Sequence, residues 1–376
     1  MSLFSYAVLS IDGGGIRGII PCKVLEEIEK RSGRPIADLF DLMAGTSTGG
    51  ILTAGLAIAD DAGRPKFSAN SLLSLYTGQN GKTIFRKPLP GILNYFRLPF
   101  TSLFPGENIE KVLNQEFGEK VRMADIVSNT ELFITSYDTQ MKCPFYFRSR
   151  IAREKAAENF RITDITRSTS AAPTYFPPKL LQYGGRVDGN KVDDLGLIDG
   201  GVFANNPSVL AYVEAMQMYK ETDEYRAAFR TESATVDRDM TAKVKPDNFA
   251  PPILLISIGT GQTEKPYPYS NTKGWGLKWL MPLIDILMQG VSESVHYQMQ
   301  HLLPPYLSPS GEVARRYYRL NIPIAKEFSD MSDVSDKNLG RLEKYGEELI
   351  DQYSDDIDKI VAELTAIQAR RELSEF

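Results

Sequence analysis

The stretch YAVLSIDGGGIRG, residues 6–18, joins a mostly apolar run to a glycine-rich loop. Residues 6–11 predict a buried strand. Residues 21–31, after the loop, have helical periodicity, and Pro21 is tolerated there because the first turn of a helix does not need its N–H. A strand, a tight glycine loop and a helix in this order are typical of an α/β sheet protein.

The same alternation continues along the chain. We expect further strands at residues 39–44, 132–137, 145–148, 253–258 and 315–320, and helices at residues 49–59, 109–117, 208–219 and 338–353. This order predicts a three-layer α/β fold, in which a mostly parallel central sheet has helices on both faces. We expect one domain over residues 1–376: residues 5–210 carry the motifs, 221–250 form a polar surface insertion, and 251–376 complete the sheet and add C-terminal helices.

Composition excludes several classes of protein. The 376 residues carry a net charge of -5, which argues against binding a nucleic-acid polymer, because phosphate contacts need clustered Lys and Arg. The two cysteines, Cys22 and Cys143, are too few for a disulfide framework or a thiolate metal cluster. The apolar stretch 277–288 contains Lys278 and is too short for a membrane span.

A second loop carries a candidate nucleophile. LMAGTSTGG, residues 42–50, places Ser47 between two glycines at the spacing G-x-S-x-G, directly after a predicted strand. A serine on a sharp strand-to-helix turn projects its oxygen at the carboxyl edge of the sheet. With 29 glycines in the chain this spacing arises easily by chance, so the neighbouring loops must decide its meaning.

The first glycine loop has two interpretations. Residues 13–18 satisfy G-x-G-x-x-G between a strand and a helix, which is the pattern of an oxidoreductase that binds a dinucleotide. That fold needs an acidic residue at the end of the second strand, where this chain has residues 45–47, Gly-Thr-Ser. Free backbone N–H groups in the loop can instead form a hole for an oxyanion beside Ser47, which is the arrangement of acyl transfer.

A third segment offers a base. Asp199 lies between the apolar run LI and a Gly-Gly turn, in residues 197–202. Partial burial there would raise the pKa of the carboxyl group and make it a usable general base. Asp-Gly-Gly by itself is typical of a simple turn, so its catalytic interpretation depends on the other two motifs.

Together the motifs resemble the patatin family of lipid acyl hydrolases. The matching stretches, in the family's order, are DGGGIRG at 12–18, GTSTGG at 45–50, TSAAPTYFPP at 169–178 and DGG at 199–201. The resemblance extends from about residue 5 to the last helix. It implies a dyad of Ser47 as nucleophile and Asp199 as base, and an oxyanion hole from the backbone amides of Gly14, Gly15 and Arg17. It also implies acyl esters of membrane lipids as substrates, with no metal or cofactor.

The N-terminus has no basic segment followed by a cleavage site, unlike plant storage patatins. The resemblance therefore points to intracellular, bacterial-type members, and we expect a cytoplasmic protein with peripheral contact at the inner membrane face. Some such relatives are antiphage effectors switched on by cyclic nucleotides, so a cyclic-nucleotide activator is part of what the resemblance implies. No residue pattern indicates a cyclic-nucleotide site, and the oligomeric state stays open.

Three further points are left open by the sequence. Ser47, Asp199 and His296 have the chain order of an α/β-hydrolase triad, although His296 and His301 fit a pair of surface or packing histidines in a helix. The aromatic and apolar segments 88–104 and 275–288 could rest on a lipid interface, or cap the core or a partner subunit. A protein that binds lipid without catalysis would use neither Ser47 nor the glycine loop.

Overall fold

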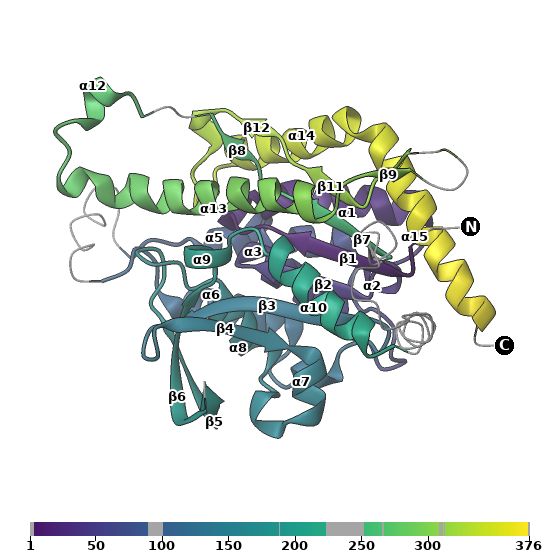
Figure 1. Ribbon diagram of the computed structural model, residues 1–376. Helices are drawn as coiled ribbons and strands as arrows, with labels where there is room; N and C mark the ends of the chain where they lie inside the picture. Colours follow the sequence, from purple (N-terminus) through teal and green to yellow (C-terminus); the bar gives the residue numbers. More distant parts are fainter. Residues whose placement is uncertain are drawn as a thin grey trace, which may run out of the picture.

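A central sheet organises the molecule. The computed structural model describes residues 4–374 except 89–100, 188, 223–251, 265–266, 308–310 and 312. Eight strands form the sheet in the order β11-β7-β1-β2-β3-β6-β5, with β4 paired to β3 (Figure 1). These strands are β1 (Tyr6–Ile11), β2 (Leu42–Thr46), β3 (Glu131–Asp138), β4 (Cys143–Arg148), β5 (Lys179–Val187), β6 (Asn190–Asp199), β7 (Ile253–Ile258) and β11 (Tyr317–Leu320).

The strand directions place a ligand-binding edge at the end of β1. The neighbours β11, β7, β1, β2 and β3 are parallel, whereas β4 and β6 run antiparallel to β3, and β5 antiparallel to β6. The chain adds β2 and β3 on one side of β1, and β7 and β11 on the other. The carboxyl end of β1 is therefore a topological switch point, the place where open α/β sheets bind their ligands.

Helices cover both faces of the sheet, each over its own hydrophobic core. Successive side chains of β1 show the division: Leu9 and Ile11 enter the larger core, and Val8 enters the smaller core on the opposite face. The larger core is covered by α1 (Ile19–Ser32), α3 (Thr48–Ala57), α6 (Gly106–Phe117), α8 (Ile162–Thr169), α14 (Asp336–Gln352) and α15 (Ser354–Ser374). The smaller core is covered by α10 (Ser208–Lys220) and α13 (Leu280–Leu302). The predicted fold class, a mostly parallel sheet between two helical layers, is confirmed.

Short elements complete the described residues. The short helices are α2 (Ile36–Leu39), α4 (Ala69–Leu72), α5 (Gly78–Ile84), α7 (Ser149–Glu154), α9 (Gly201–Ala204) and α12 (Tyr269–Thr272). Single 3-10 turns are η1 (Gly15–Gly18), η2 (Leu73–Leu75), η4 (Met123–Asp125), η5 (Ala156–Glu158), η7 (Leu277–Trp279) and η8 (Lys326–Phe328). Two small ribbons pair β8 (Gln262–Thr263) with β12 (Pro323–Ile324), and β9 (Tyr306–Leu307) with β10 (Val313–Ala314). No helix among the described residues combines the length and apolarity that a bilayer crossing requires.

The observed elements differ from the predicted ones in a few places. The strands expected at 6–11 and 253–258 coincide with β1 and β7, whereas the strand expected at 39–44 begins only at Leu42, because α2 occupies the residues before it. The β5–β6 hairpin was not predicted. The expected insertion 221–250 and the apolar segment 88–104 lie mostly outside the described residues.

Candidate active site

Ser47 occupies a sharp turn between β2 and α3. Its backbone has φ 55° and ψ -122°, a left-handed conformation that a residue with a Cβ adopts only under strain. The Ser47 N–H donates a hydrogen bond of 2.8 Å to Thr169 Oγ1 at the end of α8, which holds the turn from the side. The side chain is consequently fixed at the carboxyl edge of the sheet, and only 6% of the residue is exposed.

The two glycines of G-x-S-x-G are required by close packing. A Cβ on Gly45 would lie 2.3 Å from the carbonyl oxygen of Gly49, and a Cβ on Gly49 would lie 2.2 Å from the carbonyl oxygen of Ile11. Both distances are far below van der Waals contact. The first turn of α3 can lie directly against β1 and β2 only because these side chains are absent, which explains the spacing of the motif.

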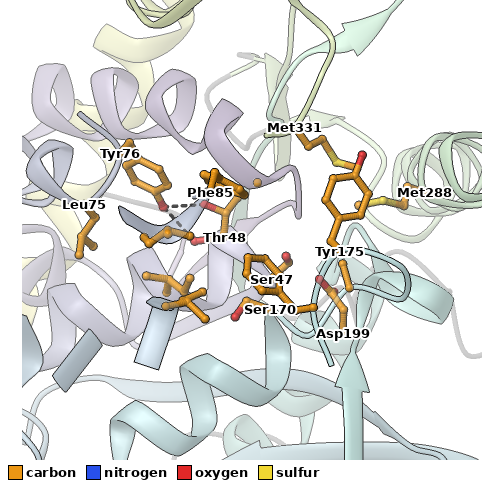
Figure 2. A pocket seen from close by; sticks show the side chains of 16 residues that line it. Ser47, Thr48, Leu75, Tyr76, Phe85, Ser170, Tyr175, Asp199, Met288 and Met331 are labelled. Atoms are coloured by element: carbon orange, nitrogen blue, oxygen red, sulfur yellow. Dashed lines mark hydrogen bonds between the residues drawn. The ribbon is translucent and has the colours of Figure 1, made fainter. Parts of the chain in front are cut away.

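Sheet register brings Asp199 to the level of Ser47. Thr46 of β2 pairs with Thr135 of β3, and Ser136, the next residue of β3, pairs with Asp199 at the end of β6. Thr135 and Ser136 also pair with β4 along the other edge of β3, so β2 and β6 follow one another along the same edge. The carboxyl ends of β2 and β6 therefore meet there, which places Asp199 next to the turn that carries Ser47. Figure 2 shows these two side chains pointing toward one another.

The environment of Asp199 prepares the carboxyl group to act as a base. One oxygen, Oδ1, accepts a 2.7 Å hydrogen bond from the N–H of Gly201, and within the described part of the chain Oδ2 has no partner. Burial raises the pKa of Asp199 to about 7, although the nearby Ser47 hydroxyl and the Gly201 N–H both act to lower it. The Ser47 hydroxyl therefore lies near the Asp199 carboxyl group, although no hydrogen bond within the described part of the chain joins Ser47 to Oδ2.

Two side chains fix the peptide planes of the glycine loop. Thr260 Oγ1 donates a 2.7 Å hydrogen bond to the carbonyl oxygen of Gly13. The carbonyl oxygen of Gly14 accepts from the N–H of Arg17 at 3.2 Å and from Arg17 Nε at 3.3 Å. Because C=O and N–H point in opposite directions across a trans peptide, the N–H groups of Gly14 and Gly15 point away from Thr260 and Arg17.

Cavities on the two sides of the loop show where these N–H groups point. Thr260 and Arg17 line a polar cavity of about 410 Å³, whereas Gly15 lines the cavity that contains Ser47 and Asp199. Among the described residues neither amide, Gly14 or Gly15, has a hydrogen-bond acceptor. The Arg17 amide, the third one expected, already donates to Gly14, so Arg17 holds the loop in shape.

A buried ion pair anchors the start of the loop. Arg319 of β11 reaches across β7 and donates from Nη1 to Asp12 Oδ1 at 2.8 Å and from Nη2 to Oδ2 at 2.6 Å. Ser292 of α13 donates to the same Oδ2 at 3.4 Å. This paired, hydrogen-bonded geometry is what a buried charge requires. The aspartate of DGGGIRG therefore positions the glycines that follow it.

The cavity at Ser47 has about 590 Å³ of space and mainly apolar walls. Figure 2 shows Leu75 and Tyr76 at one end of it, and Tyr175, Met288 and Met331 at the other. Its lining residues are Gly15, Ser47, Thr48, Ile51, Leu75, Tyr76, Ile84, Phe85, Ile109, Ser170, Ala172, Tyr175, Phe176, Asp199, Met288 and Met331. Walls of this kind, with a few polar groups at one point, suit a largely apolar ligand.

Both histidines lie elsewhere. His296 Nδ1 is 3.2 Å from the hydroxyl of Tyr317, and His301 Nδ1 is 2.8 Å from the carbonyl oxygen of Tyr297. Neither histidine lines the cavity that contains Ser47. Within the described ranges no group of three or more His, Cys, Asp or Glu side chains is arranged to hold a metal ion.

Three residues that support the site were not predicted: Thr169, Thr260 and Arg319. Thr169 begins the stretch TSAAPTYFPP, whose likeness to a known family gave a signal without assigning a role. Thr260 follows β7 in a Gly-Thr-Gly turn, a weak signal for a loop at the same sheet edge. Arg319 had no signal, because its partner lies more than three hundred residues away.

Known proteins resemble this chain over most of its length. The profile of the patatin-like phospholipase family matches residues 9–212. Patatin-like protein 1 of Arabidopsis thaliana is 32% identical over 363 residues, which cover 91% of this chain and 81% of the plant protein. Patatin-16 of Solanum tuberosum is 29% identical over 357 residues, which cover 91% of this chain and 83% of that protein. Among solved structures, VipD from Legionella pneumophila overlaps with a TM-score of 0.38 at 12% identity, covering 95% of this chain and 67% of that one.

The chain belongs to the patatin-like phospholipase family. Patatin-like proteins are lipid acyl hydrolases, so membership supports a hydrolase activity of the phospholipase type and argues against the dinucleotide-binding alternative. The two sequence relatives named above are plant proteins, and the expectation of a bacterial-type member stays a prediction.

Proposed function

We propose that this protein hydrolyses fatty-acyl esters of membrane phospholipids, with Ser47 as nucleophile and Asp199 as the only general base. One observation carries the proposal: a serine on a strained turn faces a buried carboxyl group whose pKa is about 7, inside an apolar cavity. A base with a pKa near the working pH is ionised often enough to accept a proton and acidic enough to return it.

Acylation begins with Asp199 in its ionised form. Oδ2 takes the hydroxyl proton of Ser47 while Oγ attacks the ester carbonyl carbon. The carbonyl oxygen becomes an oxyanion, which the N–H groups of Gly14 and Gly15 stabilise. When the tetrahedral intermediate collapses, the bond to the leaving alcohol breaks, and Asp199 returns the proton to that alcohol. Ser47 then carries the fatty acid as an ester.

Deacylation repeats the sequence with water. Asp199 accepts a proton from the water that attacks the acyl carbon, a second oxyanion forms in the same hole, and the proton returns to Ser47 Oγ as the fatty acid leaves. Because one carboxyl group serves both as base and as returning acid, we assign much of the rate to the oxyanion N–H groups.

The test compares two serines in the same cavity. A fluorophosphonate probe should label Ser47 in the full chain, and Ser47→Ala should abolish both the label and the hydrolysis of p-nitrophenyl butyrate. Ser170 also lines the cavity, but its hydroxyl donates to the carbonyl oxygen of Thr166, so Ser170→Ala is the matched control and should keep both. Hydrolysis by folded Ser47→Ala protein would remove Ser47 from the mechanism.

Related experiments test the remaining expectations. Phospholipid vesicles in place of the soluble ester, with fatty acids and lysolipids identified by mass spectrometry, give the acyl position and the preferred head group. Adding cyclic nucleotides to parallel reactions tests the expected activator. Fractionation of cells that express the protein tests the expected cytoplasmic location with peripheral membrane contact.

A further inference from the structure

An arm of the molecule carries exposed aromatic and apolar side chains beside the active-site cavity. The arm comprises α12, η7 and the first turns of α13, residues 267–287. Figure 1 shows α12 and the beginning of α13 projecting from the body at the left of the view, whereas the remainder of α13 lies over the sheet. Several of the arm's apolar side chains are exposed in the part of the chain that the structure describes.

The first turns of α13 present two different faces. Asp285, Met288 and Ser292, spaced three and four residues apart, face the body and line the polar cavity behind the glycine loop. The hydroxyl of Tyr267 donates a 3.0 Å hydrogen bond to Asp285, which holds that charge on the inner face. The outer face is apolar and open. Leu283, Ile286 and Leu287 are 47%, 40% and 50% exposed.

Aromatic rings and lysines adjoin this outer face. The ring centroids of Trp275 and Trp279 lie 5.0 Å apart, and Tyr269 is 80% exposed. Lys273 and Lys278 are both exposed. Residues 267–284 contain these two lysines and no acidic residue, in a chain whose net charge is -5. Rings with a polar edge, apolar side chains and lysines together are the composition that suits the boundary between lipid head groups and acyl chains.

We propose that the outer face of this arm docks on a lipid bilayer that carries anionic head groups. The inference rests on the proposed function, because it names the surface on which that function finds its substrate. The outer part of the acyl region receives the side chains of Leu283, Ile286 and Leu287. The two tryptophans lie at the level of the head groups. Lipid phosphates are contacted by Lys273 and Lys278.

The charges favour a bilayer over a second copy of the chain. In a twofold dimer formed through this face, the same patch would meet itself, and the lysines of each copy would come close to those of the other. An anionic surface instead attracts them, at about 1 kcal/mol for each lysine. The arm also adjoins the active site, because Met288, on the inner face of the same helix, lines the Ser47 cavity.

Tryptophan fluorescence reports on the arm alone. The chain contains two tryptophans, and both, Trp275 and Trp279, belong to it. We would titrate the full-length Ser47→Ala protein, which leaves the lipid intact, with vesicles of phosphatidylglycerol and phosphatidylcholine, and with vesicles of phosphatidylcholine alone. A saturable blue shift is expected with the anionic vesicles. An emission spectrum unchanged by either vesicle would overturn the proposal.

A matched pair of triple variants then links docking to turnover. Leu283→Ser, Ile286→Ser and Leu287→Ser together should lower hydrolysis of anionic vesicles by about tenfold or more and leave hydrolysis of p-nitrophenyl butyrate unchanged. The control replaces three exposed apolar residues of other elements, Leu180, Val213 and Leu373, by serine, and should keep both activities. Equal vesicle activity in the two triple variants would overturn the proposal.

The outcomes separate this inference from the proposed function. If the wild-type protein hydrolyses neither the soluble ester nor vesicles, the proposed function fails, whatever the fluorescence shows. If it hydrolyses the soluble ester but the arm variant behaves as wild type on vesicles, only the docking surface fails. Light scattering without lipid is the third measurement, and a dimer that the arm variant loses would assign the face to self-association instead.

Discussion

Glycines in two regions of this molecule have opposite surroundings. At the turn that carries Ser47, a Cβ on Gly45 or Gly49 would lie within 2.3 Å of backbone atoms, whereas Gly274 and Gly276 in the arm have nothing within 4 Å of that position. The first region is packed so closely that its groups are preorganised for chemistry. In the second region, the arm, the side chains are exposed and can contact a partner. Changes at the sheet edge should therefore affect every ester, and changes on the arm only esters that are part of a bilayer.

The largest expected effect is on the base. Asp199→Asn should lower kcat/KM for p-nitrophenyl butyrate and for vesicles alike by about 10²- to 10⁴-fold, the range typical of losing a general base. The double variant His296→Ala, His301→Ala should keep most of the activity, because both side chains lie outside the Ser47 cavity. The converse result, a dead histidine variant and an active Asp199→Asn, would replace the dyad by a triad.

The pH dependence sharpens the assignment of that base. Burial raises the pKa of Asp199 to about 7, so the carboxyl group is protonated and inactive below this pH and able to accept a proton above it. We expect kcat/KM for the soluble ester to rise with pH around a midpoint near 7 and to be about a hundredfold lower at pH 5 than at its plateau. Circular dichroism at each pH controls for unfolding. A profile flat down to pH 5 would contradict the role of Asp199.

The support of the glycine loop should show a smaller effect. Thr260→Val keeps the shape of the side chain and removes its hydrogen bond to the carbonyl oxygen of Gly13. We expect kcat to fall up to about tenfold with little change in KM, since one hydrogen bond is worth about 1 kcal/mol and acts on the oxyanion N–H. An increase in KM alone would indicate a role in substrate binding instead.

The smallest expected effect lies on the arm. Lys278→Gln should weaken binding to vesicles that contain phosphatidylglycerol by about fivefold at low ionic strength, corresponding to about 1 kcal/mol. The loss should shrink as salt is added and disappear on phosphatidylcholine vesicles. Co-sedimentation with the two kinds of vesicle measures it, and turnover of the soluble ester should not change. Equal losses on both kinds of vesicle would show that the charge of Lys278 does not contribute to vesicle binding.

The parallel part of the fold could be predicted because each signal is local. β1 and β7 are apolar runs that each end close to a glycine, and the glycine loop and the turn at Ser47 are short motifs that can be read from neighbouring residues. The hairpin β5–β6 escaped prediction because its glycines and acidic residues break the alternation, and a register shift between Gln182 and Gly185 interrupts the pairing. The beginning of α13 was not predicted as a helix, because Pro282 interrupts the apolar run; Pro282 lies in the first turn, where a helix accommodates it.

The sequence allowed Ser47 and Asp199 to be proposed as partners, but it did not predict their relative position. Their approach depends on the register of three strands, β2, β3 and β6, which no short motif encodes. The residues that orient the oxyanion loop, Thr260 and Arg319, come from segments far along the chain and carry no spacing signal. The sequence therefore indicated the two groups that we propose to react, and it missed the side chains that hold the neighbouring loop.

The strained backbone of Ser47 has a consequence for thermal robustness. The left-handed conformation of Ser47 lowers the stability of the fold by about 1 kcal/mol. Ser47→Gly would remove this strain, because glycine adopts the conformation freely, but it would also remove the hydroxyl. Because the pKa of Asp199 is higher in the fold than in the unfolded chain, its ionisation lowers stability as pH rises toward about 7. A selection of variants by melting temperature alone would thus favour loss of both groups, so a heat-resistant version of this protein has to be selected by turnover after heating.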